Sequence, residues 1–328
     1  MKKVLITGVA GFVGSNLAKE LLDRGYEVIG IDNYSQGFKR NIQDLFANQA
    51  FKFYEGDVCD KDFCDRLIGD VGGVFHLAAF KIPRYGGALD TLHINTRGTE
   101  NILEGARKTK CKVVFASTSD IYGKNPDIPF NEGSDLVLGQ TNIKRWSYAV
   151  SKIFDEHLCY AYQEKYGLPV TIVRYFGGYG PNQNITWRGG PQSVFIECAL
   201  GKKPIPIHGN GKQRRSFTYI SDIINGTILA MERDKTIGEA FNIGNDREIE
   251  IIELAKMIWR MVNPDGEPRI EFIEYGSFSG KYEDVQRRIP DITKSKQLLG
   301  FEASVELEEG LPLAIDWQKR IPSEEKGS

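Results

Sequence analysis

A glycine-rich turn at the start of the chain constrains the fold more than any other feature. The apolar segment "KVLIT" (residues 3–7) predicts a buried strand, and "GSNLAKELLDRG" (residues 14–25) has the periodicity of an amphipathic helix. Between them Gly8, Gly11 and Gly14 are spaced G-x-x-G-x-x-G. The first two glycines permit a tight turn close to a ligand, and the third lets the helix pack on the strand. Free N–H groups at such a helix start predict a pyrophosphate site.

The rest of the first half of the chain repeats the alternation of strand and helix. Strands are expected at residues 27–32, 52–57, 72–79, 111–118 and 169–175, and helices at residues 95–109 and 146–167. Short, continuously apolar strands that alternate with helices predict an α/β fold with a doubly wound parallel sheet. We expect residues 1–176 to form the cofactor-binding domain with the catalytic side chains. Residues 177–328 are expected to form mainly a smaller C-terminal lobe for the substrate, interleaved with the first domain.

Composition excludes several other classes of protein. The chain has 328 residues and a formal net charge of −2, which gives no general attraction to nucleic acid or to an anionic membrane. Five scattered cysteines without a CxxC pair indicate reduced thiols, and the four histidines lack metal-ligand spacing, so no metal is expected. No apolar run approaches the roughly 18 residues of a membrane span, and the chain begins with a strand. These observations predict a cytoplasmic protein.

An acidic residue at the end of the second expected strand indicates the cofactor. Asp32 follows Gly14 by 18 residues, at the place where a dinucleotide-binding βαβ unit holds a ribose. A carboxylate there accepts hydrogen bonds from both ribose hydroxyls of NAD and repels the additional phosphate of NADP. The sequence therefore predicts NAD as the cofactor.

A tyrosine and a lysine four residues apart form the candidate catalytic pair. Tyr148 and Lys152 in "YAVSK" lie on one face of an expected helix. The ordinary pKa of a phenol, near 10, is too high for a base at neutral pH. A neighbouring ammonium and the positive nicotinamide ring of NAD+ stabilise the phenolate, so Tyr148 could take a proton from a sugar hydroxyl. Thr118 in "ASTSD" lies at a strand end, where the superfamily that these motifs resemble keeps a hydroxyl that hydrogen-bonds the substrate oxygen.

Together these motifs resemble the short-chain dehydrogenase/reductase superfamily, and over nearly the whole chain its extended, nucleotide-sugar-modifying branch. The resemblance implies a Rossmann-type sheet, and it places Asp57 of "EGDV" at the adenine and "HLAA" (residues 76–79) along the cofactor. Asn95 matches a residue that steadies the central strands, and His76 is interpreted as structural. The cofactor-binding set that the resemblance implies is Gly8, Gly11, Phe12, Val13, Gly14, Asp32, Asn33, Asp57, Val58, Leu77, Ala78, Ala79, Asn95, Tyr148, Lys152 and Tyr175.

The same resemblance implies a set of substrate-binding residues and a nucleotide-sugar partner, with a UDP-sugar favoured. "GNGKQRRSFTYISD" places Arg215 at the diphosphate, and "YEDVQRRIPDI" places Arg288, or its neighbour Arg287, at the nucleotide. The branch normally has Asn after "RYF", where this chain has Gly177, and Arg188 or Trp187 of the following loop is expected to compensate. The full expected set is Lys81, Arg84, Gly177, Arg188, Gln192, Arg215 and Arg288. The branch also implies a homodimer formed through the two longest expected helices.

The residues after Thr118 bear on the reaction that follows oxidation at C4 of the sugar. Simple 4-epimerases carry small or hydroxyl residues there, whereas this chain has Ser119 and then Asp120. An acid at that second position is similar to uronate decarboxylases and GDP-mannose dehydratases, which usually carry Glu. A strand would direct Thr118 and Asp120 to the same face. "RWSYAVSK" also resembles a UDP-glucuronate decarboxylase, whereas "FKIPRYGG" (residues 80–87) is similar to enzymes of UDP-N-acetylhexosamines. A UDP-uronate decarboxylase is favoured. The alternatives are a UDP-hexose or UDP-N-acetylhexosamine 4-epimerase, a 4,6-dehydratase and a non-catalytic NAD(H)-binding scaffold.

Overall fold

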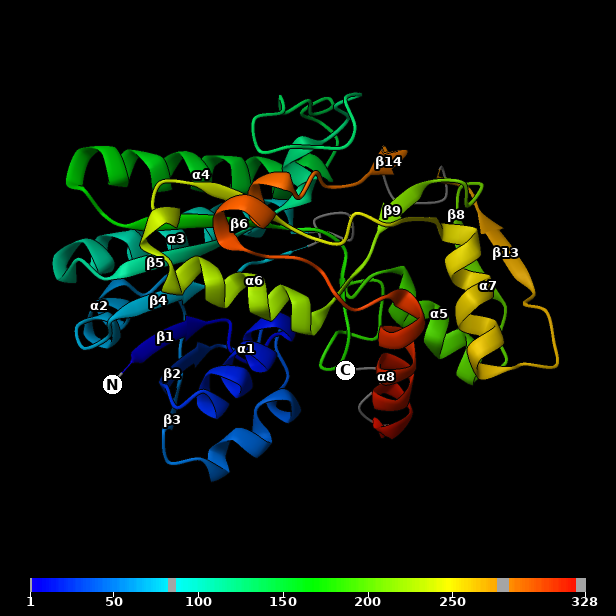
Figure 1. Cartoon of the computed structure of the whole chain (residues 1–328), viewed down its shortest axis with the longest axis horizontal. Helices are drawn as coiled ribbons and strands as arrows, with labels where there is room; N and C mark the ends of the chain where they lie inside the picture. Colours follow the sequence, from blue (N-terminus) through cyan, green and yellow to red (C-terminus); the bar gives the residue numbers. More distant parts are fainter. Residues whose placement is uncertain (1, 82–86, 276–282, 323–328) are drawn as a thin grey trace.

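A seven-stranded, entirely parallel sheet forms the larger part of the molecule (Figure 1). The computed structural model describes residues 2–81, 87–275 and 283–322. Across the sheet the strand order is β11-β6-β5-β4-β1-β2-β3. The bounds are β1 Lys3–Thr7, β2 Glu27–Asp32, β3 Phe51–Glu55, β4 Gly73–His76, β5 Lys112–Thr118, β6 Val170–Tyr175 and β11 Ala240–Ile243. The predicted doubly wound α/β fold is therefore confirmed.

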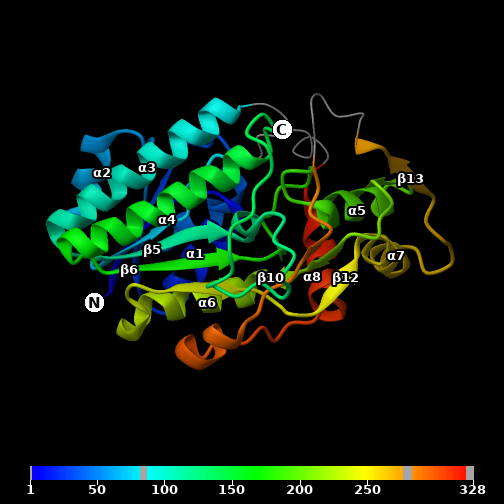
Figure 2. The ribbon, with the colours of Figure 1, turned by 90° about the horizontal axis from the view of Figure 1, so that it is seen from above.

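Helices cover both faces of this sheet (Figures 1 and 2). Helices α2 (Lys61–Ile68), α3 (Ala88–Thr109) and α4 (Trp146–Tyr166) lie on one face, and α1 (Phe12–Asp23) and α6 (Ile220–Glu232) lie on the other. Alternate residues of a strand enter opposite cores, because successive side chains of a strand point to opposite faces. In β1, Val4 and Ile6 pack with the core of α1 and α6, whereas Leu5 packs with that of α2 and α3.

Most of the remaining elements form a smaller lobe at the carboxyl end of the sheet (Figure 1). Short strands pair within it as β12-β9-β14, β13-β8 and β10-β7. Its helices are α5 Pro191–Leu200, α7 Ile251–Val262 and α8 Leu307–Arg320. Its strands are β7 Gly178–Tyr179, β8 Ile205–His208, β9 Arg214–Ser216, β10 Thr218–Tyr219, β12 Glu248–Glu250, β13 Ile270–Ile273 and β14 Arg287–Arg288.

Short helical turns occur along the whole chain and are not confined to this lobe. They are η1 Lys39–Asn41, η2 Gln43–Ala47, η4 Ser119–Tyr122, η5 Asp234–Thr236 and η7 Ser295–Leu299.

The chain returns to the large sheet after it has begun this lobe. Helix α6 covers the sheet, and β11 pairs in parallel with β6, from Ala240 opposite Ile172 to Ile243 opposite Tyr175. Residues after 176 thus contribute to both parts of the molecule, and a domain boundary at residues 176 and 177 stays a prediction.

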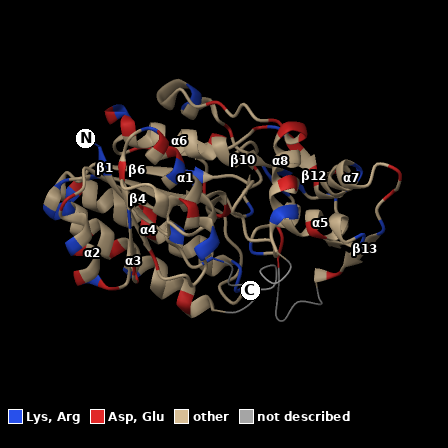
Figure 3. Cartoon of the chain, turned by 90° about the horizontal axis from the view of Figure 1, so that it is seen from below, with Lys and Arg blue, Asp and Glu red and all other residues tan. Residues whose placement is uncertain are grey.

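Charged side chains of both signs are interspersed over both lobes (Figure 3). This distribution agrees with the formal net charge of −2. Within the described part of the chain, no helix is both long enough and apolar enough to cross a membrane.

Candidate active site

One continuous cavity runs from the glycine turn to the smaller lobe. Its walls include the start of α1, the carboxyl ends of β5 and β6, the first turns of α4 and the loop that precedes α5. Ligands of open α/β sheets bind outside the carboxyl ends of the strands. From the predicted set, this cavity is lined by Gly8, Gly11, Phe12, Val13, Gly14, Leu77, Ala79, Lys81, Thr118, Ser119, Asp120, Tyr148, Lys152, Tyr175, Gly177, Arg188, Gln192, Arg215 and Arg288.

The glycine turn has the geometry of a pyrophosphate site. Gly8 has a φ of +71°, and a Cβ there would lie 2.9 Å from the backbone of Ala78. A Cβ on Gly14 would lie 2.2 Å from the carbonyl oxygen of Gly8, so the helix can pack this closely only with glycine at that position. Gly11 caps α1 without a side-chain hydrogen bond, and the first turn contains no acidic residue. The N–H groups at the start of α1 are therefore available to an anion.

A second, smaller cavity next to the turn fits the adenosine half of a dinucleotide. Asp32 ends β2 there, and its carboxylate accepts hydrogen bonds from the backbone N–H of Ala10 (2.9 Å) and of Tyr34 (2.8 Å). Burial raises the pKa of Asp32, although these backbone donors oppose the effect. Asn33 donates to Asp57 over 3.0 Å. The predicted residues that line this cavity are Gly8, Gly11, Asp32, Asn33, Asp57, Val58, Leu77, Ala78 and Ala79. The residues present thus fit a dinucleotide with two free ribose hydroxyls.

One predicted cofactor residue, Asn95, lines neither cavity. Its side chain is buried, accepts from the N–H of Phe80 (2.7 Å) and donates to the hydroxyl of Ser151 on α4 (3.0 Å). Asn95 therefore holds the loop after β4 against the catalytic helix. Its expected steadying role fits this position, but direct cofactor contact does not. Tyr175 does line the cavity, and its hydroxyl bonds to that of Thr227 (2.7 Å).

The candidate catalytic residues converge on the cavity from two elements. Tyr148 and Lys152 lie on successive turns of α4, and Thr118 is the last residue of β5. In this structure burial raises the pKa of Tyr148, followed by the charges of Asp120 and Asp155, while the hydroxyl of Thr118 lowers it. The net direction is opposite to the lowering expected from Lys152. The protein's own groups therefore favour the protonated phenol in this structure.

Asp120 lies in a 3-10 turn, whereas the sequence predicted a strand at this position. The strand ends at Thr118, and residues 119–122 form the 3-10 turn η4. Strand alternation therefore does not apply to Asp120. The turn nevertheless directs Asp120 into the same cavity as Thr118, and Thr118 Oγ1 accepts the backbone N–H of Asp120 (3.2 Å).

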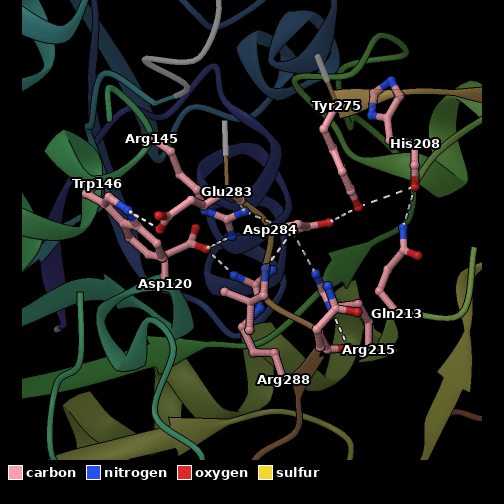
Figure 4. A network of polar contacts seen from close by, with 12 residues as sticks. Asp120, Arg145, Trp146, His208, Gln213, Arg215, Tyr275, Glu283, Asp284 and Arg288 are labelled. Carbon is pink, nitrogen blue, oxygen red and sulfur yellow. Dashed lines mark hydrogen bonds and ion pairs between the residues drawn. The ribbon is translucent and has the colours of Figure 1, made fainter. Parts of the chain in front are cut away.

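Asp120 belongs to a polar network between the two lobes (Figure 4). Arg288 donates to its carboxylate, and Arg145 Nη2 lies 3.6 Å from the same oxygen. Arg145 also donates to Asp284 (2.8 Å), which accepts from Arg215 over 3.1 Å. Because Arg145 directly precedes α4, the network joins the catalytic helix to both predicted anion-binding arginines.

Sequence reasoning did not single out Arg145 or Asp284 as site residues. Both line the cavity, and their side chains are only 10% and 11% exposed. The arginines at Asp284, helped by the hydroxyl of Tyr275, lower its pKa to about 2 although burial opposes them. Arg145 is the first residue of "RWSYAVSK", but its contact with Asp284 depends on the fold.

The other predicted substrate residues differ in what they contact. Arg287 points away from the cavity and pairs with Glu248 (2.8 Å), so Arg288 is the relevant member of the pair. Gln192 is buried and donates to the carbonyl oxygens of residues 178 and 189, which braces the loop before α5. Arg188 of that loop is exposed at the cavity wall. Arg84 lies outside the described residues.

Gly177, where the branch normally has Asn, is fixed by the backbone. It has a φ of +48°, and a Cβ there would lie 2.0 Å from the carbonyl oxygen of Ser216. A side chain at this position would displace the segment between β9 and β10. Trp187, expected to compensate, does line the cavity and stacks on His208 with ring centroids 4.1 Å apart.

The sheet, the glycine turn and the Tyr148–Lys152 pair define the class of the extended short-chain dehydrogenases/reductases. The family model described as GDP-mannose 4,6 dehydratase matches residues 5–313, and the chain belongs to this family. The predicted family is therefore confirmed.

Three relatives show how close the likeness is. The chain is 38% identical to a UDP-N-acetyl-alpha-D-glucosaminuronate decarboxylase of Bacillus cytotoxicus over 98% of this chain and 99% of that one. It is 36% identical to UDP-glucuronic acid decarboxylase 1 of Xenopus tropicalis over 97% of this chain and 72% of that one. A solved UDP-glucuronic acid 4-epimerase of Bacillus cereus, in complex with UDP-glucuronic acid and NAD, has a TM-score of 0.87 and 32% identity, covering 97% of this chain and 99% of that one.

Proposed function

We propose that this protein is an NAD+-dependent decarboxylase of a UDP-linked uronic acid. The observation that carries the proposal is the carboxylate of Asp120, paired with Arg288 in the cavity that also contains Thr118 and Tyr148. C4 oxidation requires a hydroxyl and a phenol but no such acid, whereas chemistry at C5 requires a proton carrier. The resemblance to two uronate decarboxylases over nearly the whole chain supports the same choice.

The residues act on the sugar in a defined order. Thr118 holds the C4 oxygen and Tyr148 removes its proton, while Lys152 supplies positive charge beneath the phenol. The glycine turn and Asp32 would hold NAD+, which would supply the acceptor of the C4 hydride and its donor at the end of the cycle. The resulting 4-keto uronate is a β-keto acid, so its C5–C6 bond breaks, carbon dioxide leaves, and the electron pair forms an enolate between C4 and C5. Asp120, held by Arg288, then relays to C5 a proton taken up from solvent.

Three guanidinium groups provide the anion-binding part of the site. Arg145, Arg215 and Arg288 line the cavity with side chains 10%, 11% and 19% exposed. Two carboxylates, Asp120 and Asp284, oppose them, which leaves an excess of one positive charge among these five groups. Arginine forks match phosphate and carboxylate oxygens. We assign Arg215 and Arg288 to the nucleoside diphosphate, in agreement with the role expected from the sequence.

The product distinguishes the candidate reactions. Incubation with UDP-glucuronic acid, UDP-N-acetylglucosaminuronic acid and the corresponding neutral UDP-sugars, read by mass spectrometry, should show loss of carbon dioxide from a uronate only. Loss of water would indicate a dehydratase. An unchanged mass with altered sugar proton couplings would indicate a 4-epimerase, the second candidate, which the similarity to the Bacillus cereus 4-epimerase favours. Cofactor binding without conversion of any sugar would indicate a scaffold.

We further propose that the protein forms a homodimer through α3 and α4. These helices present apolar side chains to solvent: Leu89 on α3 is 64% exposed, and Val150 and Phe154, one turn apart on α4, are 44% and 51% exposed. Large exposed apolar groups that gather on one surface mark interaction sites. Val150→Lys combined with Phe154→Lys should give a monomer in analytical ultracentrifugation, and an unchanged sedimentation coefficient would contradict this interface.

A further inference from the structure

A buried carboxylate lies on the catalytic helix, one turn beyond Lys152. Asp155 is 0% exposed and faces the protein interior. Neither of its oxygens has a hydrogen-bond partner within the described parts of the chain. A buried carboxylate without partners costs folding free energy, so its retention in a core calls for a reason.

Glu156, the next residue, is also a buried carboxylate, but its charge is compensated. Glu156 is 4% exposed and receives two bonds from Arg174, at 3.0 and 2.7 Å, and one from the hydroxyl of Ser117. The charge of Glu156 is thus neutralised by a cation of β6. Asp155 has no such bonded cation within the described part of the chain, and the pKa of its carboxyl is lowered instead by a cation on its own helix.

That cation is Lys152. Its side chain is 1% exposed, and its Nζ lies over the ring of Phe115, 4.5 Å from the centroid. Burial lowers the pKa of Lys152, and the charge of Asp155 is the largest influence that raises it, ahead of Cys159 and Glu156. Charges in the interior are little screened by solvent, so the two groups act on each other without a direct ion pair.

A directed chain of hydrogen bonds leads toward this carboxylate from the wall of the cofactor cavity. Thr7 Oγ1 accepts the N–H groups of residues 77 and 78, at 3.2 and 3.1 Å, and its own proton is therefore donated to His76 Nδ1 (2.8 Å). Burial and then the charge of Lys152 lower the pKa of His76 to about 3, so the ring is neutral at physiological pH. Its second nitrogen, Nε2, then carries the proton.

The chain of hydrogen bonds continues from His76 to α3 in the same donor-to-acceptor direction. His76 Nε2 donates to Thr99 Oγ1 over 3.2 Å, which leaves the Thr99 proton for another acceptor. The Thr99 hydroxyl lowers the pKa of Asp155, as the Lys152 charge does more strongly, but burial outweighs both and raises the pKa to about 6. The chain thus delivers a hydroxyl toward Asp155 and offers it no full positive charge, so among the neighbours named here the compensating charge comes from Lys152.

We propose that Asp155 is a positioning residue for catalysis, the internal counter-ion that keeps Lys152 an ammonium in the cavity that Tyr148 also lines. The proposal rests on the proposed function only in giving Lys152 a part in proton removal. The titratable groups around Asp155 are Tyr148, Lys152, Glu156 and Cys159 on α4, His76 on β4 and Arg174 on β6. His76 is neutral, Glu156 is paired, and the charge of Asp155 opposes ionisation of Tyr148 and Cys159, so within this set Lys152 is the group whose charged form Asp155 stabilises.

The variant Asp155→Asn keeps the shape and removes the charge. The alkaline limb of its kcat/KM profile should move to lower pH by about one unit or more, because Lys152 then loses its proton more readily. At pH 9 the variant should be about 10-fold slower than the native protein, and near pH 6 it should be almost as fast. Asp222→Asn is the matched control, since Asp222 is buried on α6 and bonds to the N–H groups of residues 304 and 305. Asp222→Asn should leave the alkaline limb of the kcat/KM profile at the same pH as in the native protein.

Thermal stability gives a readout that needs no turnover. A carboxyl whose folded pKa is about 6, above its ordinary 3.8, destabilises the fold above pH 6 and ceases to do so as the pH falls below 4. Asp155→Asn should therefore raise Tm above pH 6, with a gain that fades in acid. In a Lys152→Met background the gain should be larger, because the attraction between the two charges is already lost.

Equal gains in both backgrounds would overturn the proposal, and so would an alkaline limb that does not move while Asp155→Asn stays folded. If Asp155→Asn fails to fold, Asp155→Ser replaces it in the same cycle. A native protein that converts no nucleotide-sugar would refute the proposed function alone, since the stability cycle still measures whether Lys152 and Asp155 are coupled.

Discussion

Arg288 on β14 donates to the carboxylate of Asp120 in the turn after β5, so two residues 168 positions apart share one bond inside the cavity. Under the proposed function, this bond holds Asp120 at the place where it would act on the sugar. The C-terminal segment brings a guanidinium to the acid and fixes its direction.

Asp120→Asn should separate oxidation from decarboxylation. Thr118, Tyr148 and Lys152 remain, so the C4 oxidation proceeds, but the amide cannot carry a proton to C5. We expect the decarboxylated product to fall by about 10²-fold or more, the range for a proton-transfer group. A keto sugar should accumulate, to be trapped with labelled borohydride and detected by mass. Undiminished turnover to an isomer of the substrate would instead support the 4-epimerase.

Tyr148→Phe keeps the ring and removes the ionisable oxygen. Because burial raises the pKa of Tyr148, native activity should increase with pH as the phenolate becomes accessible. The variant should fold, bind cofactor and lose about 10²-fold or more in kcat at every pH. Initial rates over a pH series test this expectation, and native-like turnover would remove Tyr148 from the reaction.

Asp32→Ala should reduce the preference for NAD+ over NADP+. Its carboxylate ends β2 in the smaller cavity, and its predicted role is to accept hydrogen bonds from the ribose hydroxyls and to repel the additional phosphate of NADP. Dissociation constants for both cofactors, measured by calorimetry, should differ strongly in the native protein and less in the variant. Asp70→Ala removes an exposed carboxylate and serves as the control. Equal native affinities would contradict the assignment.

Gly177→Ala should destabilise the protein more than the same substitution at a left-handed glycine with open space around its Cβ. Gly25 has a φ of +78°, and a Cβ there would meet nothing within 4 Å, so Gly25→Ala isolates the backbone strain of about 1–2 kcal/mol. At Gly177 the same strain is joined by a contact of 2.0 Å with a backbone oxygen. Urea denaturation of both variants measures the difference, and equal losses would show that the segment at Ser216 moves freely.

Asp284→Asn should weaken the contact between the lobes. Breaking a buried ion pair costs about 3–5 kcal/mol, and Asp284 holds Arg145 and Arg215 together. Because the pKa of Asp284 is lowered to about 2, its contribution is complete above pH 4 and is lost as the pH falls through 2. The Tm difference from the native protein should therefore be large at pH 7 and shrink in acid. Glu248→Gln, which breaks exposed pairs, should have a small effect.

The sequence was most informative where a local pattern has one structural solution. Continuous apolar strands that alternate with helices cannot be buried except between helical layers, so the parallel sheet was predictable. The glycine turn and Tyr148–Lys152 were equally clear, since fixed spacings within one turn or one helix determine their geometry.

Long-range relations account for what the sequence did not reveal. Arg145 meets Asp284 across 139 positions, and no local pattern encodes that pairing. Asp120 was expected on a strand because nothing in "ASTSD" marks the 3-10 turn that begins at Ser119. The positive φ of Gly177 and the bracing role of Asn95 likewise depend on neighbours that the fold supplies.

The place of β11 at the edge of the large sheet governs how the chain can be assembled. Residues 240–243 complete the sheet beside β6, yet they follow most of the first elements of the smaller lobe. During synthesis, the first 176 residues emerge with the edge of β6 unpaired, and an open edge strand is a template for aggregation. In the finished sheet the four-residue β11 replaces the six-residue β6 as the edge, and a short edge strand is a poorer template for pairing with another chain. Truncation before β11 should therefore yield a less soluble protein than the full chain.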